Sequence, residues 1–218
     1  PIGNLDDITY RAVKTFKDVD YILCEDTRVT KRILDKHKIN VKMITHNEYN
    51  ETKKVSSILQ LLIDGANIAL VTDAGTPCIS DPGYRLISNI KKEHPEIKVV
   101  SIPGPSASTA SLSISGLPSD CFYFIGFLPK KKGRQKKIKE LSSFQGSTII
   151  YESPKRVIKT IKDLFSILGN RKVFIVREMT KIYEQTFYTN LESVSLGDIE
   201  LKEKGEYVII VAKEGYEC

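Results

Sequence analysis

The stretch DAGTPCISDPG, residues 73–83, is the part of the chain that best indicates its fold. It follows the apolar run 68–71, which is typical of a buried parallel strand, and precedes residues 84–92, whose apolar spacing predicts a helix. Its glycines let the backbone approach a ligand closely, and its prolines restrict the backbone. Open α/β sheets bind ligands at the carboxyl ends of their strands. Residues 73–83 are therefore expected to be either a ligand loop or a rigid turn between strand and helix.

Three further segments show the same passage from strand to loop. Residues 103–108, PGPSAS, follow the apolar run 99–102, which predicts a strand, and open a helix of small residues predicted over 106–115. Residues 25–28, EDTR, follow a strand predicted over 19–24. Residues 1–4, PIGN, resemble a loop whose strand would precede the given sequence. Four loops at strand ends predict one shared small-molecule crevice.

The order of strands and helices predicts a two-domain α/β protein. Residues 1–117 alternate strand and helix, which is typical of a mainly parallel sheet covered on both faces. Dense turn residues near 115–120 predict a boundary, with a second α/β domain over 118–218, a mixed sheet and a cleft between the two. In that domain a helix is expected to start at Pro154 behind a capping Ser153 and to end at Gly169. Strands at 185–189 and 206–212 are expected to pair antiparallel.

Composition excludes several classes of protein. The chain has 218 residues, 41% of them hydrophobic, which is enough for proper cores. No apolar run approaches the roughly 20 residues of a membrane span, and no signal peptide pattern is present. The four cysteines, Cys24, Cys78, Cys121 and Cys218, are isolated and predict reduced thiols in a cytoplasmic protein. The three histidines lie far apart, so neither a metal site nor a Ser/His/Asp triad is expected.

A dense basic segment follows the strand predicted over 122–127. Residues 130–139, KKKGRQKKIK, place seven cations in ten positions, within a chain of net charge +6. One sign of charge dominates this segment, which favours contact with nucleic acid over the alternative of a solvated helix face. The candidate RNA-binding residues are Lys130, Lys131, Lys132, Arg134, Lys136 and Lys137.

Taken together, the loops resemble the RsmI family. The resemblance rests on PIGN and DIT near the start, EDTR at 25–28, DAGTP and SDPG within 73–83, PGPSA at 103–107, GFLP at 126–129, YESP at 151–154, REMTK at 177–181 and KGE at 204–206. One of these motifs would be weak evidence. Eight in the family's order cover nearly the whole chain.

The resemblance implies a function and a fold. Members of this family methylate the ribose 2′-hydroxyl of a cytidine in small-subunit (16S) ribosomal RNA at the decoding centre, using S-adenosylmethionine and releasing S-adenosylhomocysteine. The resemblance also implies the tetrapyrrole-methylase fold, a homodimer and a donor site between two domains. The residues that it assigns to the donor are Pro1, Ile2, Asp73, Gly75, Thr76, Pro77, Ile79, Pro103, Ser106, Ala107, Phe127, Tyr151 and Glu152.

The chemistry then requires few catalytic groups. A sulfonium methyl is already activated, so the acceptor oxygen must be aligned behind it and water excluded. A ribose hydroxyl is a poor nucleophile and needs a base. We expect Asp26 as the base and Arg28 as a phosphate clamp, with Glu25, Glu178 and Lys181 as further candidates. The alternative for residues 25–28 is a helix N-terminus with favourable acids.

Two other functions remain open at this point. The chain could be a small-molecule methylase of the same superfamily, acting on a tetrapyrrole-like acceptor. It could also be a non-catalytic RNA-binding module that keeps the fold. The basic segment and the EDTR motif favour the RNA methyltransferase.

Overall fold

The computed structural model describes residues 1–216, so Cys218 lies outside the described residues. The chain forms two compact units that divide between Ser106 and Ala107. This division falls one helix earlier than the boundary expected at residue 117. The reason is helix α5 (Ala107–Ser113), whose Leu112 packs with the core of the second unit.

The first unit contains a three-stranded sheet in the order β2-β1-β3. All three strands are parallel, as the alternation of strand and helix predicted. They are β1 (Tyr21–Cys24), β2 (Lys42–Thr45) and β3 (Ile68–Leu70).

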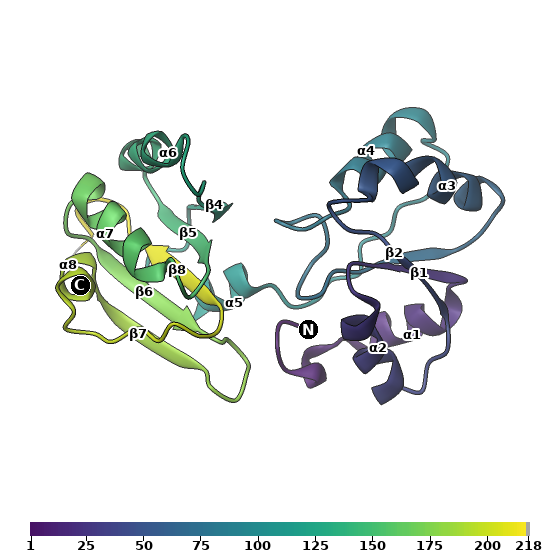
Figure 1. The fold of residues 1–218 in the computed structure, drawn as a ribbon, viewed down its shortest axis with the longest axis horizontal. Coiled ribbons are helices and arrows are strands. Elements are labelled where there is room, and N and C mark those ends of the chain that lie inside the picture. Colours follow the sequence, from purple (N-terminus) through teal and green to yellow (C-terminus); the bar gives the residue numbers. More distant parts are fainter. Residues whose placement is uncertain (217–218) are drawn as a thin grey trace. The chain divides into compact units, whose positions relative to one another are not determined.

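Helices cover both faces of this sheet. Alternate residues of β1 point to opposite faces, as strand geometry requires. Ile22 and Cys24 share a buried cluster with helices α1 and α2, whereas Leu23 packs with α3 and α4. Figure 1 shows the two pairs of helices on opposite sides of the sheet. The helices are α1 (Tyr10–Asp18), α2 (Thr27–Lys36), α3 (Glu51–Ile63) and α4 (Tyr84–Glu93), preceded by the 3-10 turn η1 (Leu5–Asp7).

The strand expected over residues 99–102 is not formed. This segment has no strand assignment, and Val99 and Val100 expose 37% and 59% of their surface. An apolar run becomes a strand only where a neighbour supplies ladder hydrogen bonds. No strand among the described residues pairs with this segment.

The second unit contains a mixed five-stranded sheet, as predicted, in the order β4-β5-β8-β6-β7. Strands β4 and β5 are parallel, and the other neighbours are antiparallel. The strands expected at 185–189 and 206–212 do not pair with each other, because both flank β6 instead. The strands are β4 (Phe122–Phe127), β5 (Ser147–Glu152), β6 (Lys172–Arg177), β7 (Gln185–Asn190) and β8 (Tyr207–Val211).

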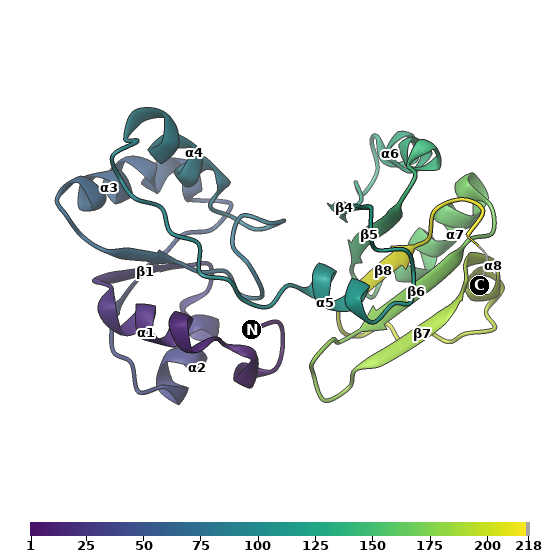
Figure 2. The same cartoon turned by 180° about the vertical axis from the view of Figure 1, so that it is seen from behind.

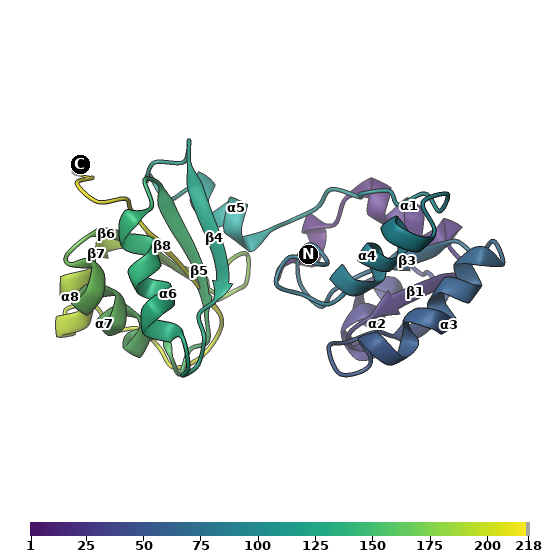
Figure 3. The same ribbon diagram turned by 90° about the horizontal axis from the view of Figure 1, so that it is seen from above.

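Three helices cover one face of this sheet and α5 covers the other (Figures 2 and 3). The covering helices are α6 (Arg134–Glu140), α7 (Val157–Leu168) and α8 (Leu191–Leu196), with the 3-10 turn η2 (Leu141–Ser143) after α6. Helix α7 ends at Gly169, as predicted, but begins later than Pro154. The Ser153 carbonyl accepts hydrogen bonds from the amides of Arg156 and Val157, so residues 154–156 form a turn before the helix.

Candidate ligand-binding site

The loop between β3 and α4, residues 71–83, lies at the carboxyl edge of the first sheet. Gly75 and Gly83 have left-handed backbones with φ of 90° and 119°, and so do the non-glycine residues Cys78 and Ser80, with φ of 70° and 64°. A side chain raises the energy of that conformation, so such residues persist only where surrounding contacts hold them. The loop therefore depends on residues outside itself.

Glu25, which follows β1, holds the beginning of this loop. Its carboxylate Oε1 accepts a hydrogen bond from the Thr72 hydroxyl and one from the Asp73 amide at 3.3 Å. In return, the Asp26 amide donates to Asp73 Oδ1 at 3.1 Å. The structure thus brings Glu25, Asp26 and Asp73 together, although the chain separates them by more than forty residues.

Pro1 and Pro105, which belong to the other two predicted loops, contact the loop 71–83 directly. The Gly75 amide donates to the Pro1 carbonyl at 3.0 Å, and the Thr76 hydroxyl donates to the Pro105 carbonyl at 3.4 Å. A Cβ on Gly75 would lie 3.5 Å from the Ile2 side chain, which is an ordinary van der Waals contact. These contacts join Pro1, Ile2 and Pro105 to the loop that carries the predicted donor residues Asp73 to Ile79. Among the predicted donor residues of the first unit, Asp73, Thr76, Ile79 and Pro103 are exposed.

Several carboxylates gather at the carboxyl edge of the first sheet, where the pKa values of Asp73 and Asp81 are raised. Burial raises the pKa of Asp73, and the neighbouring carboxylates of Glu25 and Asp26 raise it further. Burial also raises the pKa of Asp81 to about 6, with the charges of Glu25 and Asp73 acting in the same direction. A positive charge bound beside such carboxylates reduces their mutual repulsion and stabilises their ionised forms.

Asp26 and Arg28 form an ion pair at the start of α2. Asp26 is the N-cap, and its carboxylate accepts from the Arg28 amide at 2.8 Å and from Arg28 Nη2 at 2.5 Å. These hydrogen bonds lower the pKa of Asp26 to about 2. A carboxylate held in this way is a weak base, so the structure favours the helix-capping alternative for the unliganded protein. The Arg28 side chain is 87% exposed and available to an anion.

Glu178 and Lys181 belong to a separate ion-pair network in the second unit. Lys181 Nζ lies 2.9 Å from Glu178 Oε1 and 2.7 Å from Glu206 Oε2. Burial opposes both charges, but these bonds outweigh it, lowering the pKa of Glu178 and raising that of Lys181. A Cβ on Gly205 would lie 2.4 Å from Glu178 Cγ, which explains the glycine of the KGE motif. Both candidate side chains are therefore engaged in holding their own loop.

The predicted donor residues of β4 and β5 divide into two kinds. Phe127 is 55% exposed, and its ring lies 5.8 Å from that of Tyr151, whose hydroxyl accepts from the Ser108 amide. Glu152 is instead 2% exposed, and its carboxylate accepts from the Ser153 amide and the Thr160 hydroxyl. Phe127 and Tyr151 can present aromatic surface to a ligand, whereas Glu152 is occupied by internal contacts.

The basic segment is exposed at four of its six candidate residues, Lys130, Lys131, Lys132 and Lys136. Lys137 is half-buried and lies over the Tyr123 ring, 5.1 Å from its centre. Arg134 is 5% exposed and points into the second unit. Its guanidinium donates to Asp163 Oδ2 and to the Thr160 hydroxyl, both at 2.7 Å. Arg134 is therefore not among the exposed cations of the basic segment, and its charge holds α6 to α7.

Three residues of the first unit were not singled out from the sequence. Thr72 lies next to the stretch 73–83 and Asp81 lies within it, so their place in the sequence could have marked them as candidate site residues. Glu51 sits far from every motif, and nothing local marks it. Among residues 1–216, no cluster of three potential metal ligands is found, and no helix has the length and apolar character needed to cross a membrane.

Comparison with known proteins agrees with these features. The sequence family described as Tetrapyrrole (Corrin/Porphyrin) Methylases matches residues 1–195. The chain is 43% identical to the ribosomal RNA small subunit methyltransferase I of Thermotoga maritima, over 97% of this chain and 95% of that protein. It is 44% identical to the protein of the same name from Halalkalibacterium halodurans, over 99% of this chain and 74% of that protein.

Two solved structures confirm the fold. The cobalt precorrin-4 methyltransferase CbiF superposes with a TM-score of 0.69 at 16% identity, covering 96% of this chain and 90% of that one. The methyltransferase CobJ superposes with a TM-score of 0.70 at 14% identity, covering 99% and 92%. At such low identity the likeness concerns the fold alone.

Proposed function

The chain belongs to the tetrapyrrole methylase family, and among its members to the ribosomal RNA small subunit methyltransferases I; from this premise we propose that it methylates small-subunit (16S) ribosomal RNA. The proposed reaction transfers the methyl group of S-adenosylmethionine to the ribose 2′-hydroxyl of a cytidine at the decoding centre. The protein is proposed to act in the cytoplasm as a homodimer.

The observation that supports this proposal most directly is the meeting of loops in the first unit. Residues 1–2, 25–26, 73–76 and 105 are joined by hydrogen bonds or close packing, and acidic side chains gather there. S-Adenosylmethionine supplies an activated methyl group on a positively charged sulfur. Carboxylates with raised pKa values suit that cation, so the residues present fit the donor.

We assign the donor contacts to the residues that the loops expose. Asp73 would hold a donor hydroxyl or amino group, and the backbone from Gly75 to Ile79 would line the donor. Glu152 is not assigned a direct contact, because its carboxylate is buried and already accepts hydrogen bonds.

The acceptor side of the proposal depends on the Asp26–Arg28 pair. An RNA phosphate that binds the exposed guanidinium of Arg28 would compete with the Asp26 carboxylate for its donors. The pKa of Asp26 would then rise from about 2, because the hydrogen bonds from Arg28 are what lower it. Asp26 is therefore proposed to become an effective base only when RNA is in place. Glu25, Glu178 and Lys181 are assigned to positioning.

The lysines of the basic segment supply the proposed RNA surface. Four of them are exposed: Lys130, Lys131, Lys132 and Lys136. Exposed lysines bind nucleic acids by neutralising the charge of backbone phosphates. Lys137 beside Tyr123 adds a cation next to an aromatic ring.

The experiment that tests the proposal is methyl transfer to unmodified small ribosomal subunits. Radiolabelled S-adenosylmethionine, the purified protein and unmodified subunits should give label in 16S RNA, at a single cytidine resistant to alkaline cleavage on its 3′ side. Label on a tetrapyrrole acceptor but not on RNA would favour the small-molecule methylase. RNA binding without any binding of S-adenosylmethionine in calorimetry would favour the non-catalytic module. Light scattering tests the homodimer.

A further inference from the structure

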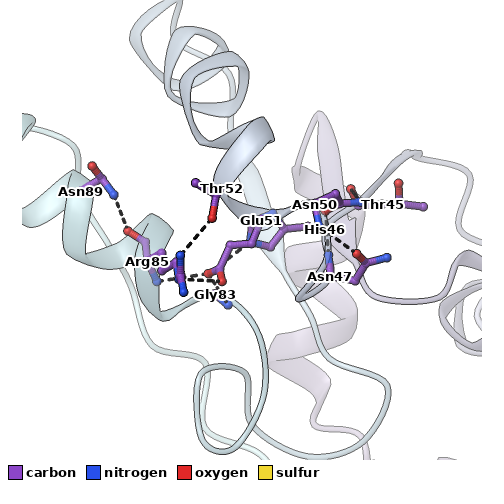
Figure 4. A network of polar contacts seen from close by, with 9 residues as sticks. All are labelled: Thr45, His46, Asn47, Asn50, Glu51, Thr52, Gly83, Arg85 and Asn89. Atoms are coloured by element: carbon purple, nitrogen blue, oxygen red, sulfur yellow. Dashed lines mark hydrogen bonds and ion pairs between the residues drawn. The ribbon is translucent and has the colours of Figure 1, made fainter.

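Glu51 is a buried carboxylate that serves a helix other than its own. It is the first residue of α3 and is 7% exposed. Its Oε1 accepts hydrogen bonds from the Gly83 amide at 3.0 Å and the Arg85 amide at 3.1 Å, at the start of α4 (Figure 4). Gly83 is the N-cap of α4 and has no side chain that could satisfy these amides. Glu51 therefore provides the cap that the sequence of α4 lacks.

The other polar groups near Glu51 lie farther from its carboxylate than the two backbone amides of α4. Arg85 Nε is 3.7 Å from Glu51 Oε2, and Arg85 Nη1 donates to the Thr52 hydroxyl at 3.0 Å, so the two helix starts are held together. His46 Nε2 lies 3.8 Å from Glu51 Oε1, but burial lowers the pKa of His46, which favours its neutral form. The strong hydrogen bonds to this carboxylate thus come from the α4 backbone.

Residues 71–83 are consequently held at both ends by glutamates from elsewhere in the first unit. Glu25 binds Thr72 and Asp73 at the beginning, and Glu51 binds Gly83 at the end. The segment between contains left-handed Cys78 and Ser80. Backbone in that conformation relaxes when the contacts that hold it are lost.

We propose that Glu51 is a positioning residue for methyl-donor binding: by capping α4 it fixes the end of the loop 71–83 in the conformation that binds S-adenosylmethionine. This inference rests on the proposed function of that loop. Glu51 itself touches no donor atom. Glu51 instead raises the fraction of molecules in which loop 71–83 has the binding conformation. When that fraction falls, the apparent affinity for the donor falls in the same proportion.

The test compares three variants of the whole chain by calorimetric titration with S-adenosylhomocysteine. Glu51→Ala removes the cap, and we expect its dissociation constant to rise about tenfold with unchanged stoichiometry, because most molecules then have a disordered loop. Glu51→Gln keeps an amide oxygen that can accept from both backbone amides, and we expect it to bind within about twofold of the unchanged chain. Glu48→Ala, at an exposed glutamate three residues earlier, is the matched control and should bind normally.

Several results would overturn the inference. Normal affinity in Glu51→Ala would do so, and so would equal weakening in Glu51→Gln. A reduced stoichiometry with unchanged affinity would show that Glu51 only supports folding. Hydrogen exchange without ligand adds a second measure: the amides of Gly83 and Arg85 should exchange faster in Glu51→Ala than in Glu51→Gln. If the unchanged chain failed to bind S-adenosylhomocysteine, the proposed function would fall together with this inference. If the unchanged chain and Glu51→Ala bound equally well, only this inference would fall.

Discussion

Replacing Arg134 by glutamine should destabilise the second unit and leave RNA binding almost unchanged. The side chain is 6% exposed and binds Asp163, Thr160 and the Pro129 carbonyl. Its guanidinium also lies 4.0 Å from the fully buried carboxylate of Glu152. Glutamine is too short to reach these acceptors and carries no charge.

The expected loss of stability follows from what the substitution leaves behind. Removing one partner of a buried ion pair costs about 3–5 kcal/mol. We expect the lower end, about 3 kcal/mol, because Asp163 is 30% exposed and Glu152 keeps Arg156 at 3.4 Å. For a unit of this size, each kcal/mol shifts the melting temperature by about 4–8 °C, so the melting temperature of the second unit should fall by about 12–24 °C.

Two assays separate stability from RNA contact. Differential scanning calorimetry measures the melting of the second unit, and filter binding between 50 and 200 mM salt measures how affinity depends on salt. The exposed lysines provide the contrast: changing Lys131, Lys132 and Lys136 together to glutamine should leave melting unchanged and reduce the salt slope by about 2–3. If Arg134→Gln melted normally and reduced the salt slope by about one, Arg134 would be an RNA contact and our interpretation of its burial would be refuted.

Three further predictions concern the first unit. Asp26→Asn should lower methyl incorporation about a hundredfold while calorimetry shows unchanged donor affinity, and a normal rate would exclude Asp26 as the base. Because burial raises the pKa of Asp81 from 3.8 to about 6, ionising it destabilises the fold as pH rises from about 4 to 6. Asp81→Asn should therefore raise the melting temperature at pH 7 but not at pH 3.5, and equal shifts at both would contradict this pKa. Gly83→Ala should lower the free energy of unfolding by about 2 kcal/mol or more, because its Cβ would lie 2.5 Å from the Leu70 side chain. Gly65→Ala, also at a left-handed position but with no atom within 4 Å of the new Cβ, should lower it by only about 1 kcal/mol. Equal urea midpoints for the two variants would argue against the clash.

Local patterns in the sequence were sufficient for most of the elements and for the family. Strand β4 over residues 122–127 and the end of α7 at Gly169 were predicted from apolar spacing and glycine position alone. The loop at 73–83 was recognised because glycine and proline restrict the backbone locally, whatever the rest of the chain does. The ordered motifs then indicated the RsmI family and with it the fold.

Only the tertiary structure decided which charged side chains are free and which are buried. Lys131 and Arg134 are near neighbours in one basic segment, but the structure exposes the first and buries the second against Asp163. Residues 99–102 have the composition of a strand, but no strand within residues 1–216 pairs with them. Glu51 caps a helix that begins more than thirty residues later. In each case the deciding partner is distant in the chain. Burial and hydrogen bonding depend on what packs alongside, whereas periodicity and backbone preference depend on the residues themselves.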